Sequence, residues 1–170
     1  MDHERCAACD FDGGRYDDDA LLDAIRALGP RWTTLLASAG GELRVRPAPE
    51  VWSAIEYAAH SRDITALHVF GVEQALTLEE PVIADIEADD LIQTAAATYG
   101  DLDPDEVASA LAGHATRLAE LAAGAPGAAW SRGLTIGDAR VDVRRLLEHA
   151  LHDSRHHVDD VERGLARLRG

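Results

Sequence analysis

The C-terminal part of the sequence concentrates histidine and carboxylate side chains, which are common metal ligands. The segment from Leu146 to Val161 reads LLEHALHDSRHHVDDV and contains four histidines. Residues four positions apart lie on the same face of a helix, so an imidazole and a carboxylate at this spacing can reach one ion. The segment therefore predicts a metal site on a helix.

A second group of such residues lies about ninety positions earlier in the sequence. Within WSAIEYAAHSRD, at residues 52–63, Glu56, His60 and Asp63 recur at helical spacing and share one helix face. Helical bundles commonly build metal sites from side chains that point inward from facing helices. We therefore expect the two segments to face each other and to hold one divalent ion.

The spacing of apolar residues indicates which side of the last segment faces the core. At about 100° per residue, one stripe gathers Val143, Leu147, Ala150, Leu151, Val158, Val161 and Leu165. On this geometry His157 points inward and Asp153 borders the stripe. We therefore predict His60, Asp153 and His157 as ligands. Three protein ligands leave coordination positions open for water or substrate, as a catalytic metal site requires.

An alternative register uses His152 and His156 in place of Asp153 and His157. It keeps two histidines in the pair but requires a helix rotated from the phase that its apolar residues indicate. In the preferred phase His149, His152 and His156 are solvated surface residues.

Other polar residues of the two segments have less direct roles in this interpretation. Glu56 and Asp63, each about one turn from His60, either accept a hydrogen bond from its second ring nitrogen or act as a general base. His68 and His114 are interpreted as surface residues.

Composition favours helices as the elements that position these residues. The chain has 170 residues, of which 46% are hydrophobic and only 5% aromatic, which suits one all-α domain. Capping residues, glycines and prolines delimit four main helices. They cover 17–37 with an interruption at Gly29-Pro30, about 49–78, 103–124 and 140–168. An extended stretch at 42–49, an acidic loop at 79–90 and a short extra helix at 90–97 connect them, which predicts a four-helix bundle over 17–170.

Residues 1–16 are predicted to form a flexible leader that contains the only two cysteines, Cys6 and Cys9. Their Cys-x-x-Cys spacing supplies two soft ligands, whereas a structural zinc site needs four. A complete site would have to use His3 or another chain, and a leader without a metal or redox role is the alternative.

The net charge and the hydropathy of the chain exclude several classes of partner. Thirty-one acidic residues against sixteen basic residues give a formal charge of −15, which disfavours binding to nucleic acid. No apolar run reaches the roughly 20 residues of a membrane-spanning helix, and the N-terminus lacks the apolar core of a signal peptide. We expect a cytoplasmic protein with no membrane or nucleic-acid partner.

The arrangement of these segments resembles the DinB/YfiT-like superfamily of four-helix bundle proteins. The resemblance covers most of the chain and rests on WSAIEYAAHSRD, on Trp130 in a loop, and on HDSRHHVDD. It implies a divalent ion, zinc or nickel first and iron or manganese as further candidates. Family members hold it with one histidine on the second helix, which His60 matches, and with a pair at i, i+4 on the fourth.

This sequence departs from the family at the first member of that pair. The usual pair is His-x-x-x-His, whereas the preferred register places Asp153 first and His157 second. The mycothiol-dependent isomerase branch is similar in pairing an acidic residue with histidine at this spacing.

The resemblance also implies a function. The superfamily includes metal-dependent hydrolases and mycothiol- or bacillithiol-type thiol transferases. We expect a metal-dependent enzyme that activates a low-molecular-weight thiol toward a small-molecule substrate. The alternatives are a metal-dependent hydrolase that uses bound water, and a non-catalytic bundle that binds a small ligand or a partner. By analogy with other small bundles, we expect a homodimer.

Overall fold

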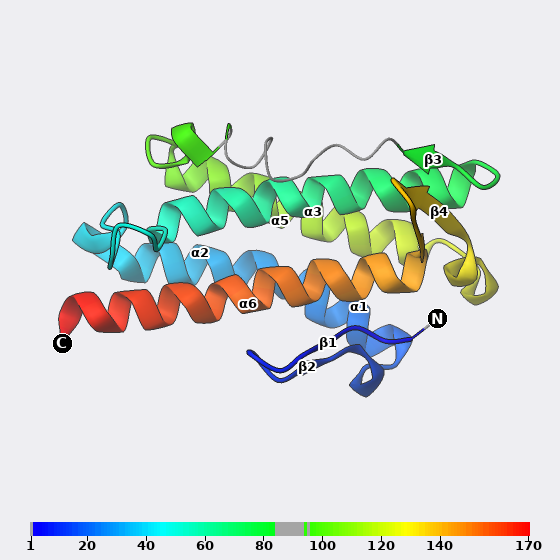
Figure 1. The fold of residues 1–170 in the computed structure, drawn as a ribbon, viewed down its shortest axis with the longest axis horizontal. Coiled ribbons are helices and arrows are strands. Elements are labelled where there is room, and N and C mark those ends of the chain that lie inside the picture. The colour runs from blue at the N-terminus through cyan, green and yellow to red at the C-terminus, as the bar shows by residue number, and fades with distance from the viewer. Residues whose placement is uncertain (1, 84–93, 95) are drawn as a thin grey trace.

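Four helical segments run side by side along the molecule in the computed structural model, which describes residues 2–83, 94 and 96–170 (Figure 1). The first segment is broken into two helices, and the others are continuous. The helices are α1 at Asp18–Arg26, α2 at Leu28–Ala39, α3 at Ala54–Thr77, α5 at Pro104–Ala123 and α6 at Val143–Arg169. The prediction of an all-α four-helix bundle is confirmed.

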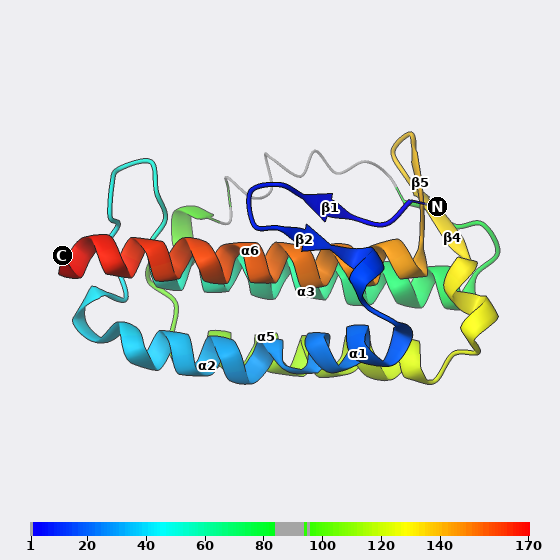
Figure 2. The same ribbon diagram turned by 90° about the horizontal axis from the view of Figure 1, so that it is seen from below.

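Each helix of the bundle has two close neighbours. α3 packs against α5 and α6, and the α1–α2 segment packs against the same two helices from the opposite side (Figure 2). α3 and α5 run in one direction, whereas α1, α2 and α6 run in the other (Figure 1). This packing brings α3 and α6, which carry the predicted ligands, directly against each other.

The core lies between the four segments and includes a buried hydrogen bond between two side chains. Leu21, Ile55, Leu111 and Leu147 are fully buried there. Burying a side chain of this size contributes about 1.5–3 kcal/mol. Trp32 is also fully buried, and its indole N–H donates a 2.8 Å hydrogen bond to Ser154 Oγ on α6.

Several helix boundaries differ from those predicted. α3 begins at Ala54 rather than near residue 49, because Ser53 and Glu56 form a capping box at its N-terminus. α6 begins at Val143, because the residues before it form a strand. The break between α1 and α2 is at Ala27, and Pro30 stands inside the first turn of α2, where its missing N–H is tolerated.

A small sheet covers one end of the bundle. It contains β3 at Val82–Ile83, β4 at Gly133–Ile136 and β5 at Ala139–Asp142, with β3 parallel to β4 and β4 antiparallel to β5. The 3-10 turn η3, Gly127–Ser131, precedes β4 and holds buried Trp130. These strands were not predicted. Of the short helix predicted at 90–97, residues 90–93 and 95 lie outside the described residues, and residues 94, 96 and 97 are helical. Much of the predicted acidic loop also lies outside the described residues.

The N-terminal segment is a hairpin that lies along α6 (Figure 2). β1, Arg5–Cys6, pairs with β2, Phe11–Asp12, and the short 3-10 turn η1 follows at Gly13–Arg15. Phe11 is only 3% exposed. The flexible leader that we predicted is therefore replaced by an ordered, packed element.

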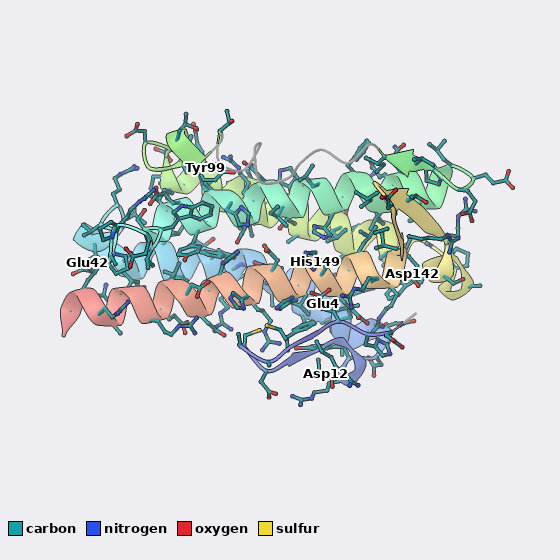
Figure 3. The ribbon with its side chains drawn as sticks, viewed as in Figure 1. Glu4, Asp12, Glu42, Tyr99, Asp142 and His149 are labelled. Atoms are coloured by element: carbon teal, nitrogen blue, oxygen red, sulfur yellow. The ribbon has the colours of Figure 1, made fainter. Side chains whose placement is uncertain are left out.

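Buried carboxylates hold this hairpin against α6. Glu4, next to His149 in Figure 3, is 4% exposed and lies 3.1 Å from Arg145. Glu148 on α6 is fully buried and accepts a 2.8 Å hydrogen bond from the backbone N–H of Glu4. A Cβ atom at Gly13 would lie 2.3 Å from the Glu148 carboxylate, so only glycine allows this close approach. Within the described part of the chain, no helix is long and apolar enough to cross a membrane.

Candidate metal centre

The phase predicted for α6 determines which side chains face α3. Every residue of the predicted apolar stripe is buried: Val143, Leu147, Ala150, Leu151, Val158, Val161 and Leu165. This confirms the orientation of the helix. Asp153 and His157 border the stripe, and their side chains are 17% and 18% exposed. They are therefore partly enclosed at the interface with α3.

The three predicted ligands come together between α3 and α6. His60 Nε2 lies 3.8 Å from Asp153 Oδ1, and His157 Nε2 lies 3.4 Å from the same oxygen. One donor atom from each of the three residues lies within 4.8 Å of the other two. The structure thus places a carboxylate oxygen and two imidazole nitrogens around one point, as the preferred register requires.

The spacing and the unpaired atoms of these groups fit a divalent ion. Two donors about 2.0–2.1 Å from a tetrahedral zinc ion are about 3.4 Å apart, close to the separations observed. Asp153 Oδ2 and His60 Nδ1 are buried without a hydrogen-bond partner among the residues described. Burial alone would raise the pKa of Asp153, but His157 and His60 outweigh it and hold the pKa of this carboxyl well below its usual range. The centre therefore presents an ionised carboxylate.

Asp160 holds the other side of the His157 ring. Its Oδ2 lies 3.0 Å from His157 Nδ1, and its Oδ1 accepts a 2.6 Å hydrogen bond from Arg163. Burial lowers the pKa of His157, but Asp153 and Asp160 outweigh that effect and raise it. With an acceptor at Nδ1, the ring of His157 directs its Nε2 toward Asp153. Hydrogen-bond acceptors behind metal-bound histidines orient the ring in the same way. We did not predict Asp160, although its i, i+3 spacing from His157 was a usable signal.

The Glu56 carboxylate forms hydrogen bonds with groups other than His60. Its carboxylate accepts hydrogen bonds from Ser53 N at 2.8 Å and Arg46 Nε at 3.0 Å. Burial alone would raise the pKa of Glu56, but these bonds outweigh it and lower the pKa. Glu56 therefore stabilises the start of α3.

Asp63 is also bonded to other groups. It accepts hydrogen bonds from Tyr99 Oη at 2.8 Å and Arg62 Nε at 2.7 Å. Because His60 Nδ1 has no partner within the described ranges, neither Asp63 nor Glu56 makes the bond to His60 that we expected. A general-base role for either carboxylate stays a prediction.

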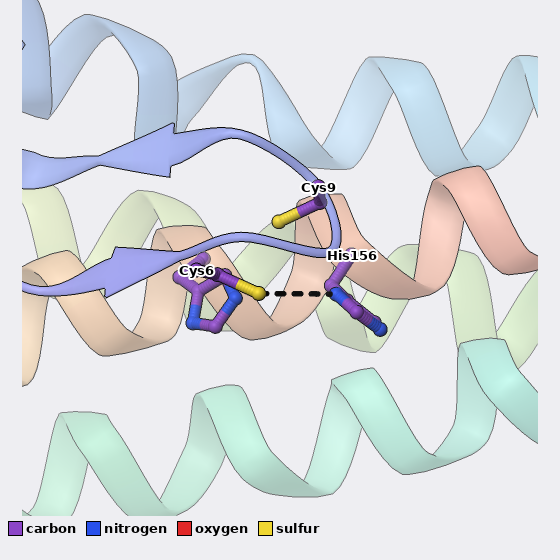
Figure 4. Close-up of side chains that lie close together, drawn as sticks. Cys6, Cys9 and His156 are labelled. Atoms are coloured by element: carbon purple, nitrogen blue, oxygen red, sulfur yellow. Dashed lines mark hydrogen bonds between the residues drawn. The ribbon is translucent and has the colours of Figure 1, made fainter.

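The histidines of the alternative register lie near the N-terminal hairpin. His152 Nδ1 is 2.6 Å from Glu4 Oε1, and His156 Nδ1 is 3.9 Å from Cys6 Sγ (Figure 4). Their side chains are only 16% and 29% exposed, so they are not the solvated surface residues that we expected. They gather with Cys6 and Cys9 rather than with His60.

Two other histidines on this side of the bundle are also constrained. His149, which is half exposed, lies 2.9 Å from Glu4 Oε1. His68 is 8% exposed and lies 2.7 Å from the carbonyl oxygen of Ile64, so its prediction as a surface residue is wrong.

Aromatic rings flank the candidate metal centre on one side. Trp52 packs edge-on against His60 with ring centroids 5.3 Å apart, and Tyr57 lies 5.0 Å from the ring of His157. Trp52 and Tyr57 contact each other at 5.5 Å. A cavity of about 890 Å³ lies elsewhere, between the hairpin, the start of α1 and η3, and the three candidate ligands do not line it. We place the chemistry at the ligand cluster because the donor atoms converge there.

Comparisons with known proteins agree with the observed fold. The family model described as the DinB superfamily matches residues 21–161. The solved structure of YfiT from Bacillus subtilis is similar, with a TM-score of 0.79 and 16% sequence identity over 89% of this chain and 87% of that chain. YfiT is described as a probable metal-dependent hydrolase with an unusual four-helix bundle topology. No curated protein matches the sequence. At this identity, the likeness to YfiT shows the fold.

Proposed function

The chain belongs to the DinB superfamily, and on that basis we propose that it is a metal-dependent enzyme with a centre formed by His60, Asp153 and His157. The observation that carries the proposal is the convergence of three donor atoms from α3 and α6. Two imidazoles and one carboxylate suit zinc or nickel, and iron or manganese also accept this set. Metal content of the purified chain identifies the ion.

The residues of this centre have separate tasks in the proposal. Asp153 supplies negative charge between the two imidazoles, and Asp160 fixes the ring of His157. Trp52 and the buried position of His60 limit the access of water from one side. When bound, a divalent ion supplies Lewis acidity and lowers the pKa of a water molecule or a thiol toward neutrality.

A low-molecular-weight thiol is the nucleophile that we propose first. The support is the Asp153-x-x-x-His157 pair, which resembles the pair in the mycothiol-dependent isomerase branch. A direct assay supplies mycothiol and chlorodinitrobenzene to metal-loaded protein. The thiol sulfur forms a bond to the aromatic carbon, chloride leaves, and the thiol proton passes to solvent. We expect transfer that requires both the metal and the thiol.

Hydrolysis is the second candidate, supported by the description of YfiT as a probable metal-dependent hydrolase. Metal-dependent cleavage of esters or amides without added thiol would favour it over thiol transfer. His60→Ala is the test variant for both assays, and His114→Ala on α5, which carries none of the three ligands, is the matched control. If the metal-loaded protein shows neither activity, the chain is a non-catalytic binding module instead.

A further inference from the structure

The turn of the N-terminal hairpin places two cysteines beside two histidines of α6. Cys6 and Cys9 flank the turn, and His156 faces them from the helix (Figure 4). Donor atoms of Cys6, Cys9, His152 and His156 all lie within 4.8 Å of one another. None of these residues belongs to the set formed by His60, Asp153 and His157.

We propose that Cys6, Cys9, His152 and His156 form a second, structural zinc site that fastens the hairpin to α6. The site does not depend on the proposed function, because it uses different ligands, which lie on a neighbouring face of the helix about 100° away.

The spacing of the four residues is that of Cys₂His₂ zinc sites. The cysteines are separated by two residues and the histidines by three, within the ranges that such sites use. In a tetrahedral site with Zn–S about 2.3 Å and Zn–N about 2.0–2.1 Å, sulfur and nitrogen lie about 3.6 Å apart. Cys6 Sγ and His156 Nδ1 are 3.9 Å apart, so only a few tenths of an ångström separate this pair from that geometry.

Glu4 prepares His152 to bind through its second nitrogen. Glu4 lies 3.1 Å from the guanidinium of Arg145, and its Oε1 lies 2.6 Å from His152 Nδ1. A carboxylate can only accept, so the ring carries its proton at Nδ1 and keeps a lone pair at Nε2. Nε2 is buried without a partner among the residues that the structure describes. A carboxylate behind a histidine is the usual outer partner of a zinc ligand.

The two cysteines supply the remaining two ligands of the zinc ion and the negative charge that balances it. On binding, both thiols would release their protons to solvent, and the two thiolates would neutralise the charge of Zn²⁺. Four protein ligands leave no open position, which distinguishes a structural site from a catalytic one.

The two sites would hold α6 from two neighbouring faces. His152 precedes Asp153, and His156 precedes His157, so the ligands of the two sites alternate along the helix. Asp160 Oδ2 lies 3.7 Å from His156 Nε2 and 3.0 Å from His157 Nδ1, and so faces both. Zinc on the hairpin side would therefore limit movement of the residues that face His60.

The test is cobalt and zinc binding by the full chain, purified under reducing conditions. Cobalt-loaded wild-type protein is expected to show thiolate-to-cobalt charge-transfer absorption and the strong visible bands of a tetrahedral ion. Cys6→Ser with Cys9→Ser should remove the charge-transfer absorption and lower the zinc content by one ion per chain. His60→Ala should keep that absorption, so loss of the proposed catalytic centre is distinguished from loss of this site. His114→Ala should match the wild type.

Two results would overturn the proposal. The first is cobalt-loaded wild-type protein with no thiolate charge transfer, a measurement that does not depend on the folding of any variant. The second is zinc-loaded wild-type protein in which both thiols react with an alkylating reagent as fast as in the metal-free chain.

Discussion

Replacing Asp160 with asparagine tests how the ring of His157 is held. Asp160 Oδ2 lies 3.0 Å from His157 Nδ1, and both side chains are at most about one-fifth exposed. The amide keeps the size of the carboxylate but loses its charge, and it can also turn its NH₂ group toward the ring. Loss of such an outer partner typically lowers metal affinity about 10–100-fold, or about 1.4–2.7 kcal/mol. We expect a loss in this range.

Because Asp160 also faces His156, the measurement belongs in the Cys6→Ser, Cys9→Ser chain, in which the hairpin site is disabled. Zinc affinity is measured there by competition with a chromophoric chelator. Asp159→Asn is the matched control, since it removes the same charge from a neighbouring position whose partner, Arg31, is 3.8 Å away. We expect a change of less than about twofold for this exposed pair. Equal losses of zinc affinity in Asp160→Asn and Asp159→Asn would refute this prediction. The loss of negative charge, rather than the loss of the contact with the His157 ring, would then explain both.

Three further substitutions test the bundle around the centre. Ser154→Ala removes the acceptor of the buried Trp32 indole N–H, so the free energy of unfolding in urea should fall by about 1–3 kcal/mol, and an unchanged value would contradict this. Burial, with a smaller contribution from a neighbouring histidine, lowers the pKa of His68 from 6.5 to about 4. Between pH 6.5 and 4 the unfolded chain therefore binds a proton at His68 that the folded chain does not. The free energy of unfolding should fall by about 3 kcal/mol over this range, and His68→Gln should largely abolish that loss. Glu56→Ala removes the capping box and the partner of Arg46, and should lower stability by about 1–2 kcal/mol, measured as a lower melting temperature.

The orientation of α6 could be predicted because its apolar residues follow the helical period without interruption. Once that stripe was assigned, the positions of Asp153 and His157 at its border followed from the rotation of 100° per residue. His60 was instead placed by its helical spacing from Glu56 and Asp63 and by the resemblance to the family. The convergence of the three side chains thus needed only the packing of two amphipathic helices against each other.

The N-terminal hairpin could not be predicted in this way. Its strands have two residues each, too few for a period to be recognised. The contacts that hold it, from Glu4 to His149 and His152, join residues about 145 positions apart. Without the hairpin in place, the histidines on the outer face of α6 have the pattern of a solvated surface. Their surroundings come from tertiary packing rather than from local sequence.

The start of α3 is determined by a local signal in the sequence. Ser53 and Glu56 have the spacing of a capping box, which places the start of the helix after Ser53 rather than near residue 49. The Glu56 carboxylate is occupied by this cap, which is why it is not available to His60. A capping role and a role at the metal are alternatives for one side chain, and the position of the helix start decides between them.

The most direct test of the central claim is the position of the metal in crystals of zinc-loaded protein, from anomalous scattering on both sides of the zinc absorption edge. We expect an anomalous peak between α3 and α6, in contact with His60 Nε2, Asp153 and His157 Nε2. This position is distinct from that of the hairpin ligands, so the same anomalous map tests each of the two proposed sites separately. The absence of a peak at this position, with His60 and His157 hydrogen-bonded to other groups, would rule out the proposed metal centre.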